Sequence, residues 1–446
     1  MNIIIAGDGE VGKHLAEALV KGNHNITIVD PHEELLKMME SHTDLMTIPG
    51  DSTSVSVLER ANIRNADLVM AVLHDEHINL LTGILAKKLG AKKVIARVNT
   101  MENLKTEMWR IYQDLGIDGM MSPEDIAAQE VVSLLDKNAT LEAYDFAGGQ
   151  LKLFMVKLEP ESELIGKTVD ETMQQYQHID FRIVAMNRRK STFVPQSDTV
   201  LQAGDLMYVI SKPLAVKEIL SLSGKKATSI HNVMIVGGGR VGRLIAKRLE
   251  NTFNIRVLEI NREKSVDLTN YLSEALVING DATDIDLLEE EGIEKIDAFI
   301  AVTNNTETNI LTCLQSKTYG VKMTVALVED TDYIEISQSL GIDSIINKKL
   351  IAASYLVRHT LGAKVSQLKF LSSIDADIVE YEVREGSAVT RNPIGSLRVP
   401  DNAVICGFSH DGESFIASDD SQIQADDRVV VFTLPDAVAS VEKLFH

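Results

Sequence analysis

The stretch NIIIAGDGEVG at residues 2–12 decides the fold of this chain. A short apolar run leads into three glycines, Gly7, Gly9 and Gly12, with the spacing GxGxxG. In a strand–turn–helix unit the first glycine permits a tight turn, the second lets a pyrophosphate approach the backbone, and the third lets the helix pack on the strand. The helix N-terminus then offers free N–H groups and a positive dipole end to phosphates. This stretch predicts a Rossmann unit.

A second stretch of the same kind, NVMIVGGGRVG, occupies residues 232–242. A single GxGxxG is weak evidence because a glycine turn needs no ligand, but two such turns, each between a strand and a helix, indicate two nucleotide sites. The loop residues expected to contact nucleotide are Gly7, Asp8, Gly9, Glu10, Val11 and Gly12 in the first copy, and Gly237, Gly239, Arg240, Val241 and Gly242 in the second.

The repeat extends well beyond the glycine loops. Gly50-Asp51 recurs 230 positions later as Gly280-Asp281, and Ala71-Val72 recurs as Ala301-Val302. The last part of each copy aligns at an offset of 222: Phe193, Asp198, Ala203 and Asp205 match Phe415, Asp420, Ala425 and Asp427. Asp426 stands where the first copy has Gly204, which leaves open whether the two turns share one geometry. A period this long predicts a duplicated domain and not a solenoid.

Each copy alternates short β-rich runs with helical segments, which predicts a parallel sheet covered on both faces. In the first copy the expected strands are 2–6, 25–30, 45–49, 67–71 and 93–98, with helices over 10–21 and 33–41. The tail of each copy has shorter strands and more turns. The predicted class is therefore α/β, with two tandem doubly wound Rossmann-like domains, each followed by a small α+β lobe. The expected boundaries are 1–136, 137–222, a linker at 223–231, 232–360 and 361–446.

Composition narrows the functional classes. The chain has 446 residues, too many for one core at about 150 residues per domain. Its net charge of -21 argues against nucleic acid and anionic membrane surfaces, and is explained by solubility or by a basic protein partner. Cys313 and Cys406 lie far apart, which excludes a disulfide scaffold. No signal peptide or membrane span is visible, so we expect a cytoplasmic protein.

An acidic residue ends the second strand of each copy. Asp30 lies 23 positions after Gly7, and Glu259 lies 22 positions after Gly237. A carboxylate at this place accepts hydrogen bonds from the ribose hydroxyls of a dinucleotide and repels a 2′-phosphate. NAD is therefore favoured over NADP, although an ordinary solvated strand-end acid remains the alternative.

Two further positions follow the third and fifth strands. Asp51 and Ser52, with Asp281 and Ala282 in the second copy, lie at the crevice edge where an adenine ring binds; for the two Asp residues, capping the next helix is the alternative. Arg97 ends the fifth strand and either faces phosphate or forms a surface salt bridge. Its counterpart is Leu327, so the two sites are expected to differ.

No motif for catalysis accompanies the glycine loops. The sequence has no HExxH, no GxSxG and no P-loop, and His74 and His77 lack a third ligand nearby. A hydride-transfer enzyme needs a general acid beside the nicotinamide, and no His-Asp or Tyr-Lys pair can be nominated. An NAD-dependent oxidoreductase remains the alternative from another functional class.

These motifs resemble the TrkA family of cytosolic regulators of Trk potassium uptake, which are built from two RCK domains. The resemblance rests on GDGEVG, VD, GDST and ARV in the first half, on GGGRVG, LE and GDAT in the second, and on the two tails AGDLMYVISK and ADDRVVVFT. It covers nearly the whole chain and assigns the positions above to nucleotide binding. Family members also bind a divalent cation near an SPE run; here Glu124 of Ser122-Pro123-Glu124 is better explained as a helix-start acid.

The resemblance implies a non-enzymatic gating-ring subunit. It implies NAD, NADH, ATP and ADP as ligands, a TrkH-like potassium-translocating partner, a homo-tetramer, and a position at the inner face of the membrane through that partner. A regulator of another cation transporter, using the same ring, is a further alternative.

Overall fold

The structure of the chain is a computed structural model that describes residues 1–7, 9–20, 24–42, 45–100, 102–136, 142–188, 191–224, 230–360, 365–371 and 376–446. It divides into two compact units. The first unit comprises residues 1–126 and 348–361, and the second comprises 127–347 and 362–446.

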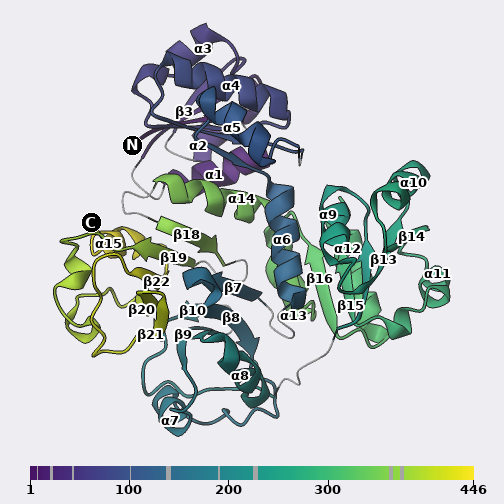
Figure 1. Ribbon diagram of the computed structural model, residues 1–446, viewed down its shortest axis with the longest axis vertical. Helices are drawn as coiled ribbons and strands as arrows, with labels where there is room; N and C mark the ends of the chain where they lie inside the picture. Colours follow the sequence, from purple (N-terminus) through teal and green to yellow (C-terminus); the bar gives the residue numbers. More distant parts are fainter. Residues whose placement is uncertain are drawn as a thin grey trace. The chain divides into compact units, whose positions relative to one another are not determined.

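The first unit contains a six-stranded parallel sheet with the strand order β3-β2-β1-β4-β5-β6. Figure 1 labels β3 of this sheet and helices α1 to α5 of the same unit. Its strands are β1 (Asn2–Ala6), β2 (Asn25–Asp30), β3 (Met46–Pro49), β4 (Leu68–Ala71), β5 (Lys93–Arg97) and β6 (Gly119–Met121). The helices that accompany them are α1 (Glu10–Val20), α2 (Glu33–His42), α3 (Val55–Arg60), α4 (Glu76–Leu89) and α5 (Thr106–Asp114). Helix α6 (Pro123–Asp136) begins in this unit, and its residues from Ala127 onward belong to the second unit.

The central strand β1, with the sequence NIIIA, is nearly all apolar because its side chains are buried on both faces of the sheet. Ile3 and Ile5 belong to one hydrophobic core, whereas Ile4 belongs to another. Successive side chains of a strand point to opposite faces, so both faces of the sheet are buried. A strand covered on both faces shows a continuous apolar run and no alternation, as observed here.

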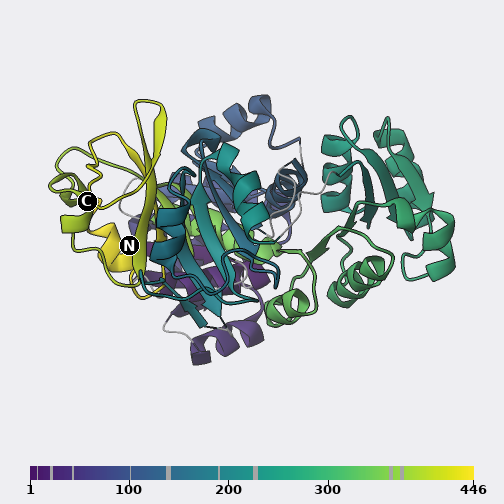
Figure 2. The same ribbon diagram turned by 90° about the horizontal axis from the view of Figure 1, so that it is seen from below.

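The second unit contains the second Rossmann lobe, with the same order, β14-β13-β12-β15-β16-β17. Its strands are β12 (Asn232–Val236), β13 (Asn254–Glu259), β14 (Leu276–Asn279), β15 (Ala298–Ala301), β16 (Met323–Leu327) and β17 (Ser344–Ile346). Its helices are α9 (Arg240–Leu249), α10 (Arg262–Tyr271), α11 (Ile285–Glu290), α12 (Thr306–Thr318) and α13 (Asp332–Ser339). Figure 2 shows helices on both sides of this sheet. The predicted duplication of a doubly wound parallel sheet is confirmed.

Two five-stranded antiparallel sheets form the small lobes, again with matching orders, β10-β9-β11-β8-β7 and β21-β20-β22-β19-β18. Their strands are β7 (Glu142–Phe146), β8 (Leu151–Lys157), β9 (Phe181–Arg188), β10 (Ser191–Phe193), β11 (Leu206–Ser211), β18 (Val365–Phe370), β19 (Asp377–Glu382), β20 (Ala403–His410), β21 (Glu413–Ile416) and β22 (Arg428–Thr433). Their helices are α7 (Val169–Gln175), α8 (Val216–Leu222) and α15 (Val438–Glu442). The two lobes share one core, in which Tyr208 and Phe432 are both fully buried.

The turn before the last long strand is the same in both small lobes. Gly204 has φ +85 and its N–H donates to Leu158, while Asp426 has φ +68 and its N–H donates to Val383. Asp tolerates the left-handed region better than most residues because its short side chain bonds locally. The Gly-to-Asp difference therefore leaves the turn geometry intact.

Helix α14 (Lys348–Val357) follows the second Rossmann lobe in sequence but packs in the first unit. Ala352 and Leu356 enter the same hydrophobic core as Ile5 and Leu15 of the first lobe. The hydroxyl of Tyr355 also donates to the backbone carbonyl of Met120 at 3.4 Å. The compact units thus interleave the two halves of the sequence, and the domain boundaries expected from the sequence stay predictions. Within the described ranges, no helix has the length and apolar character to cross a membrane.

Candidate nucleotide site

In both parallel sheets the strand order reverses at the central strand, between the first and the fourth strand of the lobe. Here β1 lies beside both β2 and β4, and β12 lies beside β13 and β15. Ligands of open α/β sheets bind at the carboxyl ends of the strands at such a switch point. The two glycine loops leave β1 and β12 at this place.

The first glycine of each loop is held in a backbone conformation that side chains disfavour. Gly7 has φ +125 and Gly237 has φ +102. Their N–H groups donate to Val29 and Leu258 of the neighbouring strand at 3.0 and 2.8 Å. The tight turn predicted at these two positions is present.

The second and third glycines have different surroundings. A Cβ at Gly12 would lie 2.0 Å from the carbonyl oxygen of Gly7, and one at Gly242 would lie 1.9 Å from that of Gly237. A Cβ at Gly9 or Gly239 would meet nothing within 4 Å. The third glycine is therefore required by helix–strand packing, whereas the second leaves open space beside the backbone, as pyrophosphate approach demands.

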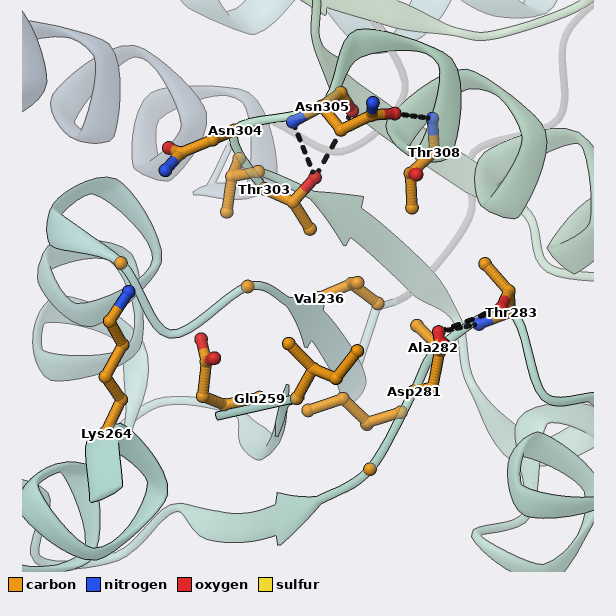
Figure 3. Close-up of a pocket in the computed structure, with 16 residues that line it drawn as sticks. Val236, Glu259, Lys264, Asp281, Ala282, Thr283, Thr303, Asn304, Asn305 and Thr308 are labelled. Carbon is orange, nitrogen blue, oxygen red and sulfur yellow. Dashed lines mark hydrogen bonds between the residues drawn. The ribbon is translucent and has the colours of Figure 1, made fainter. Parts of the chain in front are cut away.

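The second crevice contains a cavity of about 420 Å³ (Figure 3). It is lined by residues at and after the carboxyl ends of β12, β13, β14 and β15: Val236, Gly237, Gly239, Leu258, Glu259, Ile260, Lys264, Gly280, Asp281, Ala282, Thr283, Val302, Thr303, Asn304, Asn305 and Thr308. Glu259 and Lys264 lie on the side opposite Asp281 and Thr283. The structure thus brings the glycine loop, the strand-end acid and the Gly280-Asp281 loop to one cavity.

The two strand-end acids are buried and bonded to the backbone. In Glu259 one carboxylate oxygen accepts from the N–H of Gly238 at 2.7 Å, and the other accepts from Asn261 at 2.8 Å. In Asp30 a carboxylate oxygen accepts from the N–H of His32 at 3.0 Å and lies 2.7 Å from its Nδ1. The Glu259 carboxylate therefore links the strand end to the glycine loop.

Asp51 and Asp281 occupy equivalent positions after the third strand. Each accepts hydrogen bonds from the backbone and hydroxyl of the threonine two residues later. These bonds lower the pKa of Asp51 below its ordinary value. The cap residues of the following helices are Ser54 and Asp284, so the alternative of helix capping by Asp51 and Asp281 is wrong.

The residues that directly follow these acids, Ser52 and Ala282, are both buried. The Ser52 hydroxyl is buried and lies 2.9 Å from that of Thr82, so this side chain packs inward. Ala282 is buried and lines the second cavity. Only the backbone of Ser52 is thus available to an adenine ring.

Arg97 ends β5 and is buried against Glu124 in the first turn of α6, with 3.4 Å between Nη2 and Oε1. The expected position of Glu124 at a helix start is confirmed. Within the described residues, the Nε of Arg97 and the Oε2 of Glu124 have no hydrogen-bond partner. The alternative of a salt bridge at the surface is wrong, because the ion pair that Arg97 forms is buried.

Leu327 is fully buried at the corresponding place on β16. The amide of Asn79 donates to the carbonyl of Arg97, and that of Asn309 donates to the carbonyl of Leu327. An equivalent asparagine thus supports each of the two strand ends, which establishes that Arg97 and Leu327 occupy corresponding positions. The second crevice has no arginine here.

Other predicted loop residues are placed as follows. Asp8 lies outside the described residues. Glu10 and Arg240 are the first residues of α1 and α9, and Arg240 is exposed. Val11 and Val241 are buried, so their side chains pack inward while their backbone lies in the first helical turn.

Sequence reasoning missed the loop after the fourth strand and Lys264 on α10. Thr303, Asn304, Asn305 and Thr308 line the cavity from the β15–α12 loop. The rule that the crevice lies between the first and fourth strands would have pointed to this loop. Lys264 carries no motif, so only the folded geometry places it.

The described residues contain no group of three or more His, Cys, Asp and Glu side chains able to hold a metal ion. Both cysteines are fully buried, and burial raises the pKa of the Cys406 thiol to about 12. A thiolate nucleophile at this position is therefore disfavoured.

Comparison with known proteins assigns all four lobes. The TrkA-N domain family matches residues 3–123 and 233–348, and the TrkA-C domain family matches 153–224 and 378–446. A Trk system potassium uptake protein TrkA homolog 1 of Methanosarcina mazei is 32% identical over 455 residues, covering 100% of both chains. The protein named TrkA of Vibrio alginolyticus is 30% identical, covering 100% of this chain and 99% of its own.

Solved structures share the fold. The GsuK channel bound to NAD superposes with a TM-score of 0.61 at 17% identity, over 100% of this chain and 78% of that one. The GsuK RCK domain gives 0.62 at 18% identity, over 100% and 94%. The fold class predicted from the sequence is confirmed.

Proposed function

Because this chain belongs to the TrkA family, we propose that it is the cytosolic, nucleotide-sensing subunit of a gating ring that regulates a membrane potassium uptake channel or transporter. The observation that carries the proposal is the duplicated crevice. Each copy has a tight glycine turn, open space beside the second glycine and a buried strand-end acid. A sensor needs these features, whereas an oxidoreductase also needs a proton donor beside the nicotinamide.

The proposed ligands are NAD or NADH, with ATP and ADP as competitors. Asp30 and Glu259 are placed to accept from ribose hydroxyls, and α1 and α9 begin where a pyrophosphate would lie. Two structural neighbours are GsuK bound to NAD and GsuK bound to ADP. This likeness in fold supports the same class of ligand for this chain.

We propose a homo-oligomeric ring, with a tetramer as the expected assembly, beneath a TrkH-like subunit at the inner face of the membrane. The exposed large apolar side chains of the two Rossmann lobes include Ile78 and Leu81 on α4, Ile111 on α5, Leu311 on α12, and Tyr333 and Ile336 on α13. Exposed apolar side chains of this kind mark contact surfaces between proteins. No nucleic acid is expected as a partner, given the net charge of -21.

The mechanism is a shift of population between two ring states. A ligand moves a gate only by binding one state more tightly than the other. Moving a gate from 1:99 to 99:1 requires about 5.5 kcal/mol of differential binding, or about 1.4 kcal/mol at each of four equivalent sites. Repeated sites in an oligomer therefore make modest selectivity at each site sufficient.

The test is potassium flux into liposomes that contain the membrane subunit and the full chain. We expect at least one of NAD, NADH, ATP and ADP to change the flux roughly tenfold. The variant Gly9→Val/Gly239→Val should still associate with the membrane subunit but lose the response, since its added side chains fill only the ligand space. A wild-type flux that no nucleotide alters, or a double variant that still responds, would overturn the proposal.

Two outcomes identify the alternatives. Steady oxidation of NADH with a small carbonyl substrate would indicate the oxidoreductase. A flux response that appears with sodium and not with potassium would indicate a regulator of another cation transporter.

A further inference from the structure

The two crevices differ in charge at corresponding places around the ligand space. Helix α1 begins with Glu10, whereas α9 begins with Arg240. Both residues directly follow the second glycine of the loop, at the start of the helix where phosphates bind. In the sequence, Asp8 of the first loop is also replaced by Gly238. The second loop has therefore lost two acidic residues and gained one basic residue.

A second difference lies in the first turn of the helix after the second strand. Helix α2 begins with Glu33 and has Leu35 as its third residue, whereas α10 begins with Arg262 and has Lys264 third. Lys264 lines the cavity beside Glu259 (Figure 3). Within the described part of the chain its ammonium group has no ion pair or hydrogen bond. It is the basic side chain of this cavity lining.

A third difference lies in the loop after the fourth strand. Asp75 caps α4 and accepts from the N–H of His77, whereas Asn305 caps α12 and accepts from Thr308 at 2.6 Å. The cap is kept but its negative charge is lost. Each of these changes makes the second crevice more favourable for an anion than the first.

Arg97 and Leu327 differ in the opposite direction, but Arg97 is ion-paired with Glu124 in the interior. The charge of this pair is balanced, so it adds little net attraction for phosphate in the conformation described. The cation available to a ligand in the second crevice is instead Lys264, on the side of the cavity where the strand-end acid lies.

We propose that the second site selects adenosine nucleotides with a terminal phosphate, ADP and ATP, through Lys264, while the first site takes the less charged NAD or NADH. The inference rests on the proposed nucleotide-sensing function and assigns a different ligand class to each crevice. A terminal phosphate carries more negative charge than the esterified pyrophosphate of a dinucleotide, and a lysine ammonium binds phosphate as a compact charge. Glu259 stays available for the ribose hydroxyls common to all four nucleotides.

The experiment isolates each site in the full chain. Gly9→Val blocks the first site, so that only the second can bind, and Gly239→Val does the reverse. Neither variant should disturb the fold, because a Cβ at either glycine has free space. Isothermal titration with ATP, ADP, NAD and NADH is run on both variants. With only the second site open, we expect ATP and ADP to bind roughly tenfold more tightly than NADH; with only the first open, this order should disappear or reverse.

Lys264 is then tested in the Gly9→Val chain. Lys264→Leu, which copies Leu35 of the first site, should weaken ATP and ADP roughly tenfold and NADH less than about threefold, and Lys264→Arg should restore most of the loss. Lys295→Leu is the matched control, since it removes one exposed positive charge of the same lobe outside the cavity lining. Thermal melting of each variant verifies the fold.

Equal losses for ATP and NADH, no loss for either, or an equal loss in the Lys295→Leu control would overturn the assignment. These outcomes concern ligand choice alone. If the flux assay responds to nucleotide while Lys264→Leu changes nothing, the proposed function stands and this inference fails. If the titrations behave as expected while no nucleotide changes the flux, this inference stands and the proposed function fails.

Discussion

The two Rossmann lobes have the same backbone topology and differ in the side chains around the crevice. In both, the third glycine lies against the carbonyl of the first, and an asparagine supports the end of the fifth strand. Arg97, however, has become Leu327, and Leu35 has become Lys264. Positions fixed by backbone packing are the same, whereas positions that would contact ligand charge have changed. The comparison separates what holds a nucleotide fold from what selects its nucleotide.

The largest expected effect breaks the part that the lobes share. Gly12→Ala and Gly242→Ala should each lower the stability of their lobe by roughly 3 kcal/mol, because the new Cβ would overlap a backbone carbonyl that cannot move without shifting the helix. Calorimetric unfolding measures this. Gly9→Ala and Gly239→Ala are the matched controls and should change stability little; equal losses at all four glycines would contradict the packing argument.

The next prediction makes the first site resemble the second. If Arg97 binds the pyrophosphate in the liganded state, Arg97→Leu should weaken NADH binding at the first site roughly tenfold. Glu124→Gln removes the competing carboxylate and should tighten binding at the same site. Titrations in the Gly239→Val chain provide the measurement. A stronger loss with Glu124→Gln than with Arg97→Leu would mean that the pair is structural only.

A smaller difference concerns the acids that anchor the two central strands. Asp297 accepts from the N–H groups of His231 and Asn232 and from Lys322, and these bonds lower its pKa to about 2. A depressed folded pKa stabilises the protein above the unfolded pKa of about 3.9, and this stability is lost as the pH falls through about 2.

Asp297→Asn should therefore cost about 2 kcal/mol at pH 7 and less at pH 3. Asp67, the counterpart in the first lobe, also has a lowered pKa but accepts from one backbone N–H and Lys92. Asp67→Asn is expected to have the smaller effect. Urea unfolding at both pH values checks the pair, and a loss at Asp297 that does not depend on pH would contradict the assignment.

The smallest expected effect separates the two small lobes. A buried aspartate, Asp205 or Asp427, is paired with Arg188 in the first lobe and with His410 in the second, at 2.6 Å in each. Hydrogen bonding to Asp427 raises the pKa of His410, and Asp411 adds to this. A raised pKa gives stability that is present below the unfolded value of about 6.5 and is lost as the pH rises through the folded value.

Unfolding measurements should thus show that the second small lobe loses a little stability as the pH rises from about 6 to about 9. His410→Arg should abolish this loss of stability. Arg188→His should introduce the same pH dependence into the first lobe. Identical pH profiles for wild type and His410→Arg would exclude the effect.

The sequence allowed most of the fold to be predicted because its signals are local. The strands 2–6 and 25–30 were predicted with the observed bounds, since apolar runs end at glycine or an acid. The packing of α14 in the first unit could not be predicted, because Leu15 and Leu356 meet across hundreds of residues without a local pattern. The strand-end acids follow from spacing, whereas Lys264 and the burial of Arg97 against Glu124 depend on side-chain placement that only the folded chain defines.

The most direct test of two unlike nucleotide sites in one chain is the binding stoichiometry, measured by native mass spectrometry with ADP and NADH. The account predicts up to two nucleotides per wild-type chain, one per chain in Gly9→Val and in Gly239→Val, and none in the double variant, with the two single variants retaining different nucleotides. A single nucleotide per wild-type chain at saturation, or two single variants that retain the same nucleotide equally well, would contradict it.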